Sequence, residues 1–326
     1  MSLRRSGGTG SGSRKAGPKL GKVRFGPAGW MYKDWEGTVY PLPKPPRFDQ
    51  LRYIAEFFDT IEINSSFYGP PLATTSNNWV RRVEDNANFR FAAKLWKRFT
   101  HERAKAWTTA EVDQVRAGFD VLMESNRLGA VLLQFPWSFR HTEANREWFG
   151  DVVRTFSLYP LVAEVRHKSW LVPEFLRTLE EEGVGFVNID QPLFHDSIGP
   201  TAHVTSHVGY VRVHGRNYKD WFREKAPVEQ RYNYLYRADE LAPWAERAKE
   251  IASDPATREA YVITNNHYKG KAVANALMLK SMVSGQRVAA PSPVYDTYRE
   301  VLADFAEPGT HLVGAASFID GKALNG

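Results

Sequence analysis

Charged side chains interrupt an otherwise apolar run at residues 161–170, LVAEVRHKSW. Glu164 and Arg166 alternate with Ala163 and Val165. A charge inside a protein core is costly unless it is paired or used. The run therefore indicates a buried strand that ends at a working surface, where a carboxylate could exchange protons and a guanidinium could hold an anion.

Residues of the same kinds occur in or directly after other apolar runs of the chain. We expect the proton-transfer groups to be carboxylates and histidines: Glu62, Glu164, Asp190, His214 and His267. We expect an anion to be held by cations, amides and a backbone turn: Lys94, Arg166, Arg216, Asn265, Asn266, Lys269 and Gly270. Lys269 and Gly270 open an expected helix, whose free N–H groups favour a phosphate.

Aromatic residues follow the same runs and are expected to form a rim around the site. The rim residues are Trp30, Tyr32, Trp35, Tyr68, Trp96, Trp137 and Trp170. Their flat faces suit a base or a sugar ring, and an anion site beside them favours a phosphate-bearing substrate. The prediction is a hydrolase-like enzyme for a small phosphorylated or anionic substrate, with nucleic acid as an alternative partner.

Three other functions use the same residues. The acids and histidines could bind a divalent metal, as in barrels of the endonuclease IV and xylose isomerase types. Lys94, Arg166, Arg212 and Arg216 are aimed at the same place and would repel a dication, so we assign no metal ligands and no cofactor, with a divalent metal as the alternative. Two carboxylates beside aromatic rings could also hydrolyse a glycosidic bond. The third alternative is a barrel that binds a ligand without catalysis.

Eight short apolar or aromatic runs, separated by helical patterns, are the elements that must position these residues. The runs span 23–30, 60–68, 89–96, 129–137, 161–170, 184–192, 210–217 and 261–267. Amphipathic patterns between them include 48–58, 109–127, 173–182, 240–251 and 270–278, whereas 193–209 has the composition of an irregular loop. Eight strand–helix units predict a single-domain (β/α)8 barrel of the TIM type.

The alternation of residues within four of the runs predicts which side chains face the barrel axis. Apolar residues must face the helices, so the polar residues between them should point inward. The inward set is expected to be Glu62, Asn64, Glu164, Arg166, Asn188, Asp190, Arg212, His214 and Arg216. Active sites of such barrels lie at the C-terminal ends of the strands, where this set is concentrated.

Seven segments resemble the blocks of the YecE-like family, domain of unknown function 72, in the same order. They are GPAGWMYKDWEGTVYP (26–41), FFDTIEINSSFYGPP (57–71), FRFAAKLWKRFTHE (89–102), LLQFPWSF (132–139), AEVRHKSW (163–170), YVRVHGRN (210–217) and NNHYKGKAVANAL (265–277). The resemblance covers residues 23–282 and implies a TIM-type barrel with its pocket built from these blocks. It implies no reaction.

The composition limits the remaining possibilities. The 326 residues contain no cysteine, which excludes disulfides and thiol chemistry, and no apolar run is long enough to span a membrane. Residues 1–22 are basic and rich in Gly and Ser, without the apolar core of a signal peptide, so we expect a disordered tail and a cytoplasmic protein. The barrel domain is expected over 23–326, with a C-terminal extension after about residue 282. Nothing in the sequence indicates an oligomeric state.

Overall fold

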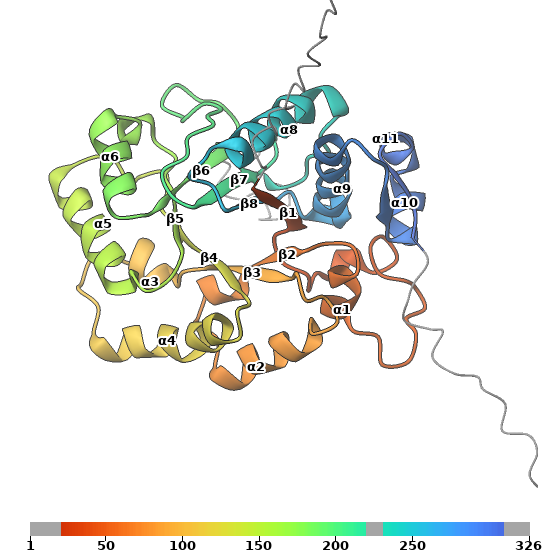
Figure 1. Ribbon diagram of the computed structural model, residues 1–326, viewed down its shortest axis with the longest axis horizontal. Helices are drawn as coiled ribbons and strands as arrows, with labels where there is room; N and C mark the ends of the chain where they lie inside the picture. The colour runs from red at the N-terminus through yellow and green to blue at the C-terminus, as the bar shows by residue number, and fades with distance from the viewer. Residues whose placement is uncertain (1–20, 220–230, 310–326) are drawn as a thin grey trace, which may run out of the picture.

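The computed structural model describes residues 21–219 and 231–309, so nearly all of the expected N-terminal tail lies outside the described residues. Eight parallel strands form one sheet that curves into a barrel with helices around it (Figure 1). The strands are β1 (Lys22–Pro27), β2 (Thr60–Ile63), β3 (Arg90–Lys94), β4 (Leu128–Gln134), β5 (Leu161–Glu164), β6 (Gly185–Asp190), β7 (Val208–Val213) and β8 (Glu259–Thr264). They pair in the order β1-β8-β7-β6-β5-β4-β3-β2, which confirms the predicted (β/α)8 barrel.

The barrel closes between its first two strands through a short contact. Ala28 and Glu62 form a parallel bridge, and the backbone N–H of Gly29 donates to the carbonyl of Glu62 at 2.8 Å. Gly26 allows this approach, because a Cβ atom at this position would lie 1.9 Å from the carbonyl oxygen of Thr60.

Helices follow most of the strands and cover the outside of the barrel. They are α1 (Gln50–Ala55), α2 (Ala73–Arg82), α3 (Lys97–Thr100), α4 (Thr109–Glu124), α5 (Glu143–Phe156), α6 (Pro173–Glu181), α8 (Ala238–Ser253) and α9 (Lys271–Ser284). Short 3-10 turns follow four strands: η1 (Lys33–Trp35), η2 (Ser65–Phe67), η3 (Lys168–Trp170) and η4 (Tyr268–Gly270). Within the described ranges, no helix combines the length and apolar composition needed to cross a bilayer.

The segment after α9 forms a small unit of its own beside that helix (Figure 1). Its elements are β9 (Val288–Ala290), α10 (Ser292–Thr297), α11 (Arg299–Leu302) and β10 (Ala306–Pro308). Strands β9 and β10 pair in parallel and form a second, two-stranded sheet.

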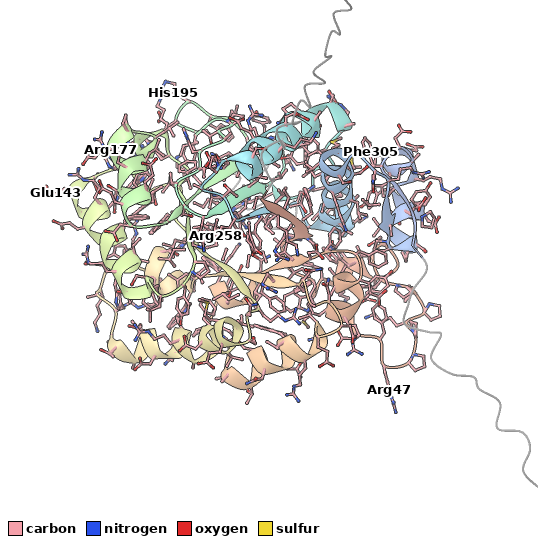
Figure 2. The ribbon with its side chains drawn as sticks, viewed as in Figure 1. Arg47, Glu143, Arg177, His195, Arg258 and Phe305 are labelled. Atoms are coloured by element: carbon pink, nitrogen blue, oxygen red, sulfur yellow. The ribbon has the colours of Figure 1, made fainter. Side chains whose placement is uncertain are left out.

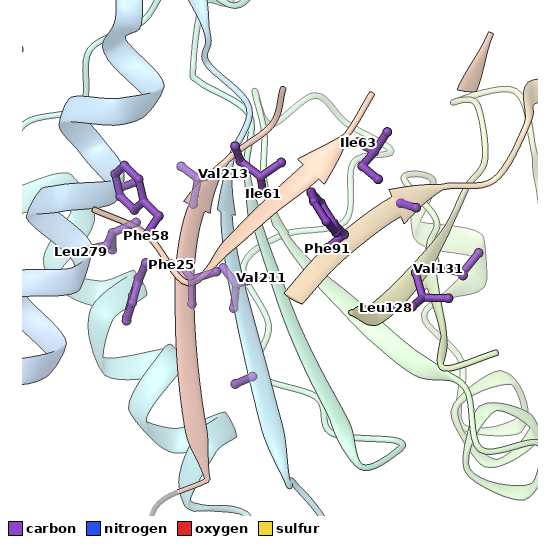
Figure 3. Close-up of a cluster of buried hydrophobic side chains, with 14 of the residues drawn as sticks. Phe25, Phe58, Ile61, Ile63, Phe91, Leu128, Val131, Val211, Val213 and Leu279 are labelled. Atoms are coloured by element: carbon purple, nitrogen blue, oxygen red, sulfur yellow. The ribbon is translucent and has the colours of Figure 1, made fainter. Parts of the chain in front are cut away.

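Two separate apolar clusters show which strand residues face outward and which face inward. The outer cluster lies between strands and helices and includes Ile61, Ile63, Val211 and Val213 (Figure 3). Ala163 and Val165 belong to the same outer cluster. Their polar neighbours on β2, β5 and β7 therefore face the axis, as the alternation predicts.

The prediction for β6 is wrong by one residue. Val187 and Ile189 belong to the inner cluster, with Val162 of β5 and Tyr210 of β7, so Asn188 and Asp190 face outward. The reason is the cover on this strand: residues 191–207 form a loop without helix or strand, as expected from their composition. His195 in this loop lies at the outer edge of the molecule (Figure 2).

A loop that packs on a strand brings backbone groups that need partners, and Asn188 supplies them. Its side-chain oxygen accepts hydrogen bonds from the Thr201 hydroxyl and the His203 N–H, both at 2.8 Å. Its amide nitrogen donates to the His203 carbonyl at 3.0 Å. Asn188 faces outward on β6 because a loop packs on this strand and its backbone groups need hydrogen-bond partners.

Candidate functional site

Arg212 on β7 lies at the centre of a buried ion cluster at the C-terminal end of the barrel axis. Its Nε donates to Oε2 of Glu62 at 2.9 Å, and one terminal nitrogen donates to Oε1 of the same carboxylate at 2.6 Å. The other terminal nitrogen donates to Glu164 at 2.5 Å and to Gln134 at 3.3 Å. One guanidinium from β7 thus connects carboxylates of β2 and β5 across the barrel.

Glu164 has two further partners. Arg166 donates to its Oε1 through Nε at 2.8 Å, and Nε2 of His214 lies 3.3 Å from the same oxygen. Asn265 contacts the other ring nitrogen of His214 at 3.1 Å. We call Glu62, Glu164, Arg166, Arg212 and His214 the axial ion cluster.

The buried charges of the axial ion cluster shift the pKa values of Glu164 and His214. Burial alone would raise the pKa of Glu164, but Arg212 and Arg166 outweigh it and hold that pKa well below its usual range. Burial, with the two arginines, lowers the pKa of His214 to about 3 against the opposing effect of Glu164. The His214 imidazole is therefore neutral at pH 7. The sequence had led us to expect a proton-transfer group at this position.

A pocket of 770 Å³ opens above this cluster, and we call it the mouth pocket. Polar groups of its lining come from the ends of four strands: Asn64, Lys94, Gln134 and Asn265. Its walls include six ring or thioether side chains: Met31, Tyr32, Phe67, Tyr232, His267 and Tyr268. Tyr68, 72 % exposed, lies at its edge.

Lys94, at the end of β3, belongs to the mouth pocket and also contacts the axial ion cluster. Its Nζ lies 3.9 Å from Oε1 of Glu62 and 5.6 Å from the ring centre of Phe67, and its side chain is 12 % exposed. Burial, followed by the charge of Arg212, lowers the pKa of Lys94 to about 8. Lys94 is thus a cation that its surroundings do not fully compensate.

His267 is the histidine that the structure places in the mouth pocket. Its ring stacks on Tyr32 with the centres 4.3 Å apart and the planes at 6°, and the Tyr232 ring lies 5.1 Å away. The Tyr32 hydroxyl donates to the carbonyl of Ala28 and accepts from Asn64 at 3.1 Å. The side-chain oxygen of Asn64 is buried and accepts no hydrogen bond from the described residues.

Asp190 and Arg216 lie outside this site and pair with each other. Two nitrogens of Arg216 contact the Asp190 carboxylate at 2.9 Å, and the Tyr236 hydroxyl donates to the same carboxylate. Arg216 also lies 3.7 Å from Glu240. Since β6 faces Asp190 outward, neither residue reaches the axial ion cluster.

The predicted phosphate position before α9 contains a carboxylate of the protein itself. The backbone N–H of Lys269 donates to Asp34 at 2.5 Å, and a Cβ at Gly270 would lie 2.4 Å from a methyl group of Val39. Asn266 is fully buried and donates to the Tyr234 carbonyl and to Asn275. These three predicted anion ligands therefore hold loops together.

The predicted aromatic rim divides into two groups. Trp30, Trp35 and Trp170 are buried in the core, where Trp35 donates to the carbonyl of His267 and Trp170 to that of Phe139. Trp96 and Trp137 are half-buried and do not line the mouth pocket. Of the predicted rim, Tyr32 and Tyr68 line the pocket.

The geometry bears on the metal and glycoside alternatives as well. Among the described residues, no group of three or more His, Asp or Glu side chains is arranged to hold a metal ion. Glu62 and Glu164 are fully buried beneath the pocket and bound to Arg212, so a sugar in the pocket would not touch them.

Some pocket residues carried little sequence signal. Asn64, directly after β2, belongs to the set that alternation predicts to face the axis, whereas Gln134, at the end of β4, has no predicted role. His101, after α3, lines a different pocket, and burial, together with Arg166 and Lys94, lowers its pKa to about 4. Tyr232 belongs to no strand and no motif that sequence reasoning could use.

Comparisons with known proteins agree on one family. The family model described as protein of unknown function DUF72 matches residues 24–297. The UPF0759 protein YunF of Bacillus subtilis is 26% identical over 274 residues, which cover 80% of this chain and 94% of that protein.

Two solved structures of DUF72 family proteins share the fold. The protein from Thermotoga maritima is 30% identical, with a TM-score of 0.69, covering 81% of this chain and 99% of its own. The protein from Enterococcus faecalis is 24% identical, also with a TM-score of 0.69, covering 80% and 95%.

Proposed function

Because this chain belongs to the DUF72 family, whose description assigns no reaction, we propose a function from the mouth pocket: an enzyme that binds a small phosphate-bearing substrate there and transfers protons through Lys94 and His267. The observation that carries the proposal is Lys94, a buried amine between the pocket and the axial ion cluster.

The charge balance favours an anionic substrate. In the axial ion cluster, Glu62 and Glu164 are matched by Arg212 and Arg166, and His214 is neutral. Lys94 is the additional cation on the same axis, and its lowered pKa records the cost of that charge. An anion bound in the pocket would offset this cost.

The other groups of the pocket favour a substrate that also carries a ring and hydrogen-bond donors. The stacked pair of Tyr32 and His267 offers a flat face for a base or sugar. The buried side-chain oxygen of Asn64 needs a donor that a ligand N–H or O–H could supply. A nucleotide or a sugar phosphate combines these features.

Two residues are suited to proton transfer with such a substrate. A lysine with a pKa near 8 is present in both protonation states around neutral pH, as a general acid or base requires. His267 lines the same pocket. Glu62, Glu164 and Arg212, which do not reach the pocket, are positioning residues beneath Lys94.

Ligand-induced stabilisation tests the proposal. We expect a nucleoside monophosphate or a hexose phosphate, at 100 times its Kd, to stabilise the protein by about 2.7 kcal/mol, and the parent nucleoside or hexose to do much less. Lys94→Met should weaken the phosphate ligand at least tenfold, whereas Lys168→Met, an exposed lysine paired with Asp196, should leave it unchanged. Equal stabilisation by neutral and phosphorylated ligands, or full binding by Lys94→Met, would contradict the proposal.

A further inference from the structure

The Lys94 amine is placed to do more than hold an anion. We infer that Lys94 forms a covalent imine with an aldehyde or ketone carbon of an anionic substrate bound in the mouth pocket. This deepens the proposed function, since it rests on the same pocket and adds the class of substrate and of intermediate.

The surroundings of Lys94 are those of an activated amine. Two cations, Arg212 and Arg166, disfavour its protonated form, and the neighbouring His101 is neutral at pH 7. Glu62 and Glu164 favour the protonated form of Lys94, but these carboxylates already pair with the two arginines. A lysine that is buried beside other cations loses its proton readily and becomes a nucleophile.

Position distinguishes Lys94 from the other lysine of the pocket. Lys33 lies on η1 at the edge, and its side chain is exposed. Lys94 ends a barrel strand and is 12 % exposed, with the Phe67 ring on one side and Glu62 on another. A nucleophile on a strand end is held in place more firmly than one on an exposed turn.

The covalent step needs no other reactant. The neutral Nζ attacks the carbonyl carbon, a C–N bond forms, the C=O electron pair moves onto oxygen, and one N–H proton passes from nitrogen to that oxygen. The resulting hydroxyl takes up a second proton, from solvent, and leaves as water, while the nitrogen lone pair forms the C=N bond of a protonated imine that keeps the other N–H proton. The imine draws electrons from the adjacent carbon, so the supported chemistry is proton removal or bond cleavage next to the former carbonyl.

Reductive trapping tests the imine directly. The full chain is incubated at pH 8 with pyridoxal 5′-phosphate and sodium cyanoborohydride, and the labelled lysines are identified by peptide mass mapping. We expect Lys94 to be labelled at least tenfold faster than the exposed Lys105 and Lys168, with half-maximal labelling near pH 8. Pyridoxal, which has the same aldehyde without the phosphate, should label Lys94 at least tenfold more slowly than its phosphate.

Variants separate this inference from the proposed function. Lys94→Arg keeps a positive charge and cannot form an imine, so it should lose the fast labelling, which Lys168→Met should retain. Fast labelling confined to exposed lysines, while phosphate ligands still bind in a Lys94-dependent way, would overturn the imine and leave the pocket in place. If Lys94 is labelled but phosphate and neutral ligands bind equally, the imine stands and the preference for phosphate falls.

Discussion

Arg212 holds the axial ion cluster together, because it is the guanidinium that contacts both buried carboxylates. We expect Arg212→Met to lower the free energy of unfolding by about 3–5 kcal/mol, since the change leaves Glu62 and Glu164 buried with less compensation. Arg212→Lys should restore little, because one ammonium cannot reproduce three N–H···O contacts on two carboxylates. Urea unfolding measures both, with Arg299→Met in an exposed ion pair as the control. Full stability of Arg212→Met would contradict this role.

Lys94, unlike Arg212, should destabilise the folded protein at pH 7. Its pKa of about 8 in the folded protein lies below the ordinary value of 10.5, so burying its positive charge on folding costs free energy at pH 7. We expect Lys94→Met to raise the free energy of unfolding at pH 7 by about 1–3 kcal/mol while ligand binding is lost.

The pH dependence checks the cause of that gain. Between pH 8 and 10.5 the unfolded chain binds more protons at Lys94 than the folded protein does, so the wild-type protein gains stability as the pH rises through this range. The advantage of Lys94→Met should therefore shrink from pH 8 upward. A variant that is less stable than the wild type at pH 7 would show that Lys94 is held by compensating contacts.

Alternation within single strands predicted the axial cluster well, but it failed on β6 and at Arg216, which follows the end of β7. The failure on β6 has a local cause. On β2, β5 and β7 the layer outside the strand is apolar, so the polar residues had to point inward. On β6 the outer layer is the 191–207 loop. The sequence predicts an irregular segment there, but it does not reveal that the backbone of this segment packs on the strand and needs polar partners. Asp190 was therefore assigned to the site although it pairs with Arg216 elsewhere.

Asn188 should anchor this loop to β6. We expect Asn188→Leu to lower the free energy of unfolding by about 1–3 kcal/mol, because the Thr201 hydroxyl and the backbone of His203 lose their partners in a buried place. Hydrogen exchange at residues 198–205 should also quicken in the variant. Asn77→Leu, which removes an exposed hydrogen bond on α2, is the control. Unchanged exchange in Asn188→Leu would mean that packing alone holds the loop.

For the whole molecule, the sequence predicts the architecture more fully than the site. Each strand is a short apolar or aromatic run and several of the long helices carry an amphipathic pattern, so eight units could be recognised one at a time. The mouth pocket depends on contacts between strand ends and segments without a periodic pattern, such as the Tyr232 loop. The sequence also does not show that the Asp34 carboxylate occupies the position before α9 where we expected a phosphate. Tryptophans could not be divided between core and rim for the same reason.

The distribution of charge over the chain separates polyanion binding from the pocket. Residues 1–20 carry five lysines and arginines and no acid, so they contribute +5 of the net charge of +6 and the rest of the chain +1.

We expect the full chain to bind single-stranded DNA with a log–log salt slope of up to about −3.5, the value for five phosphate contacts. Deleting residues 1–20 should bring that slope close to zero and leave phosphate-ligand binding in the pocket unchanged, because Lys94 lies on the barrel axis. Fluorescence anisotropy from 50 to 200 mM salt measures the first effect and calorimetry the second. If the deleted protein keeps a steep slope that Lys94→Met then reduces, the mouth itself contacts the nucleic acid and the substrate of the barrel is a polynucleotide.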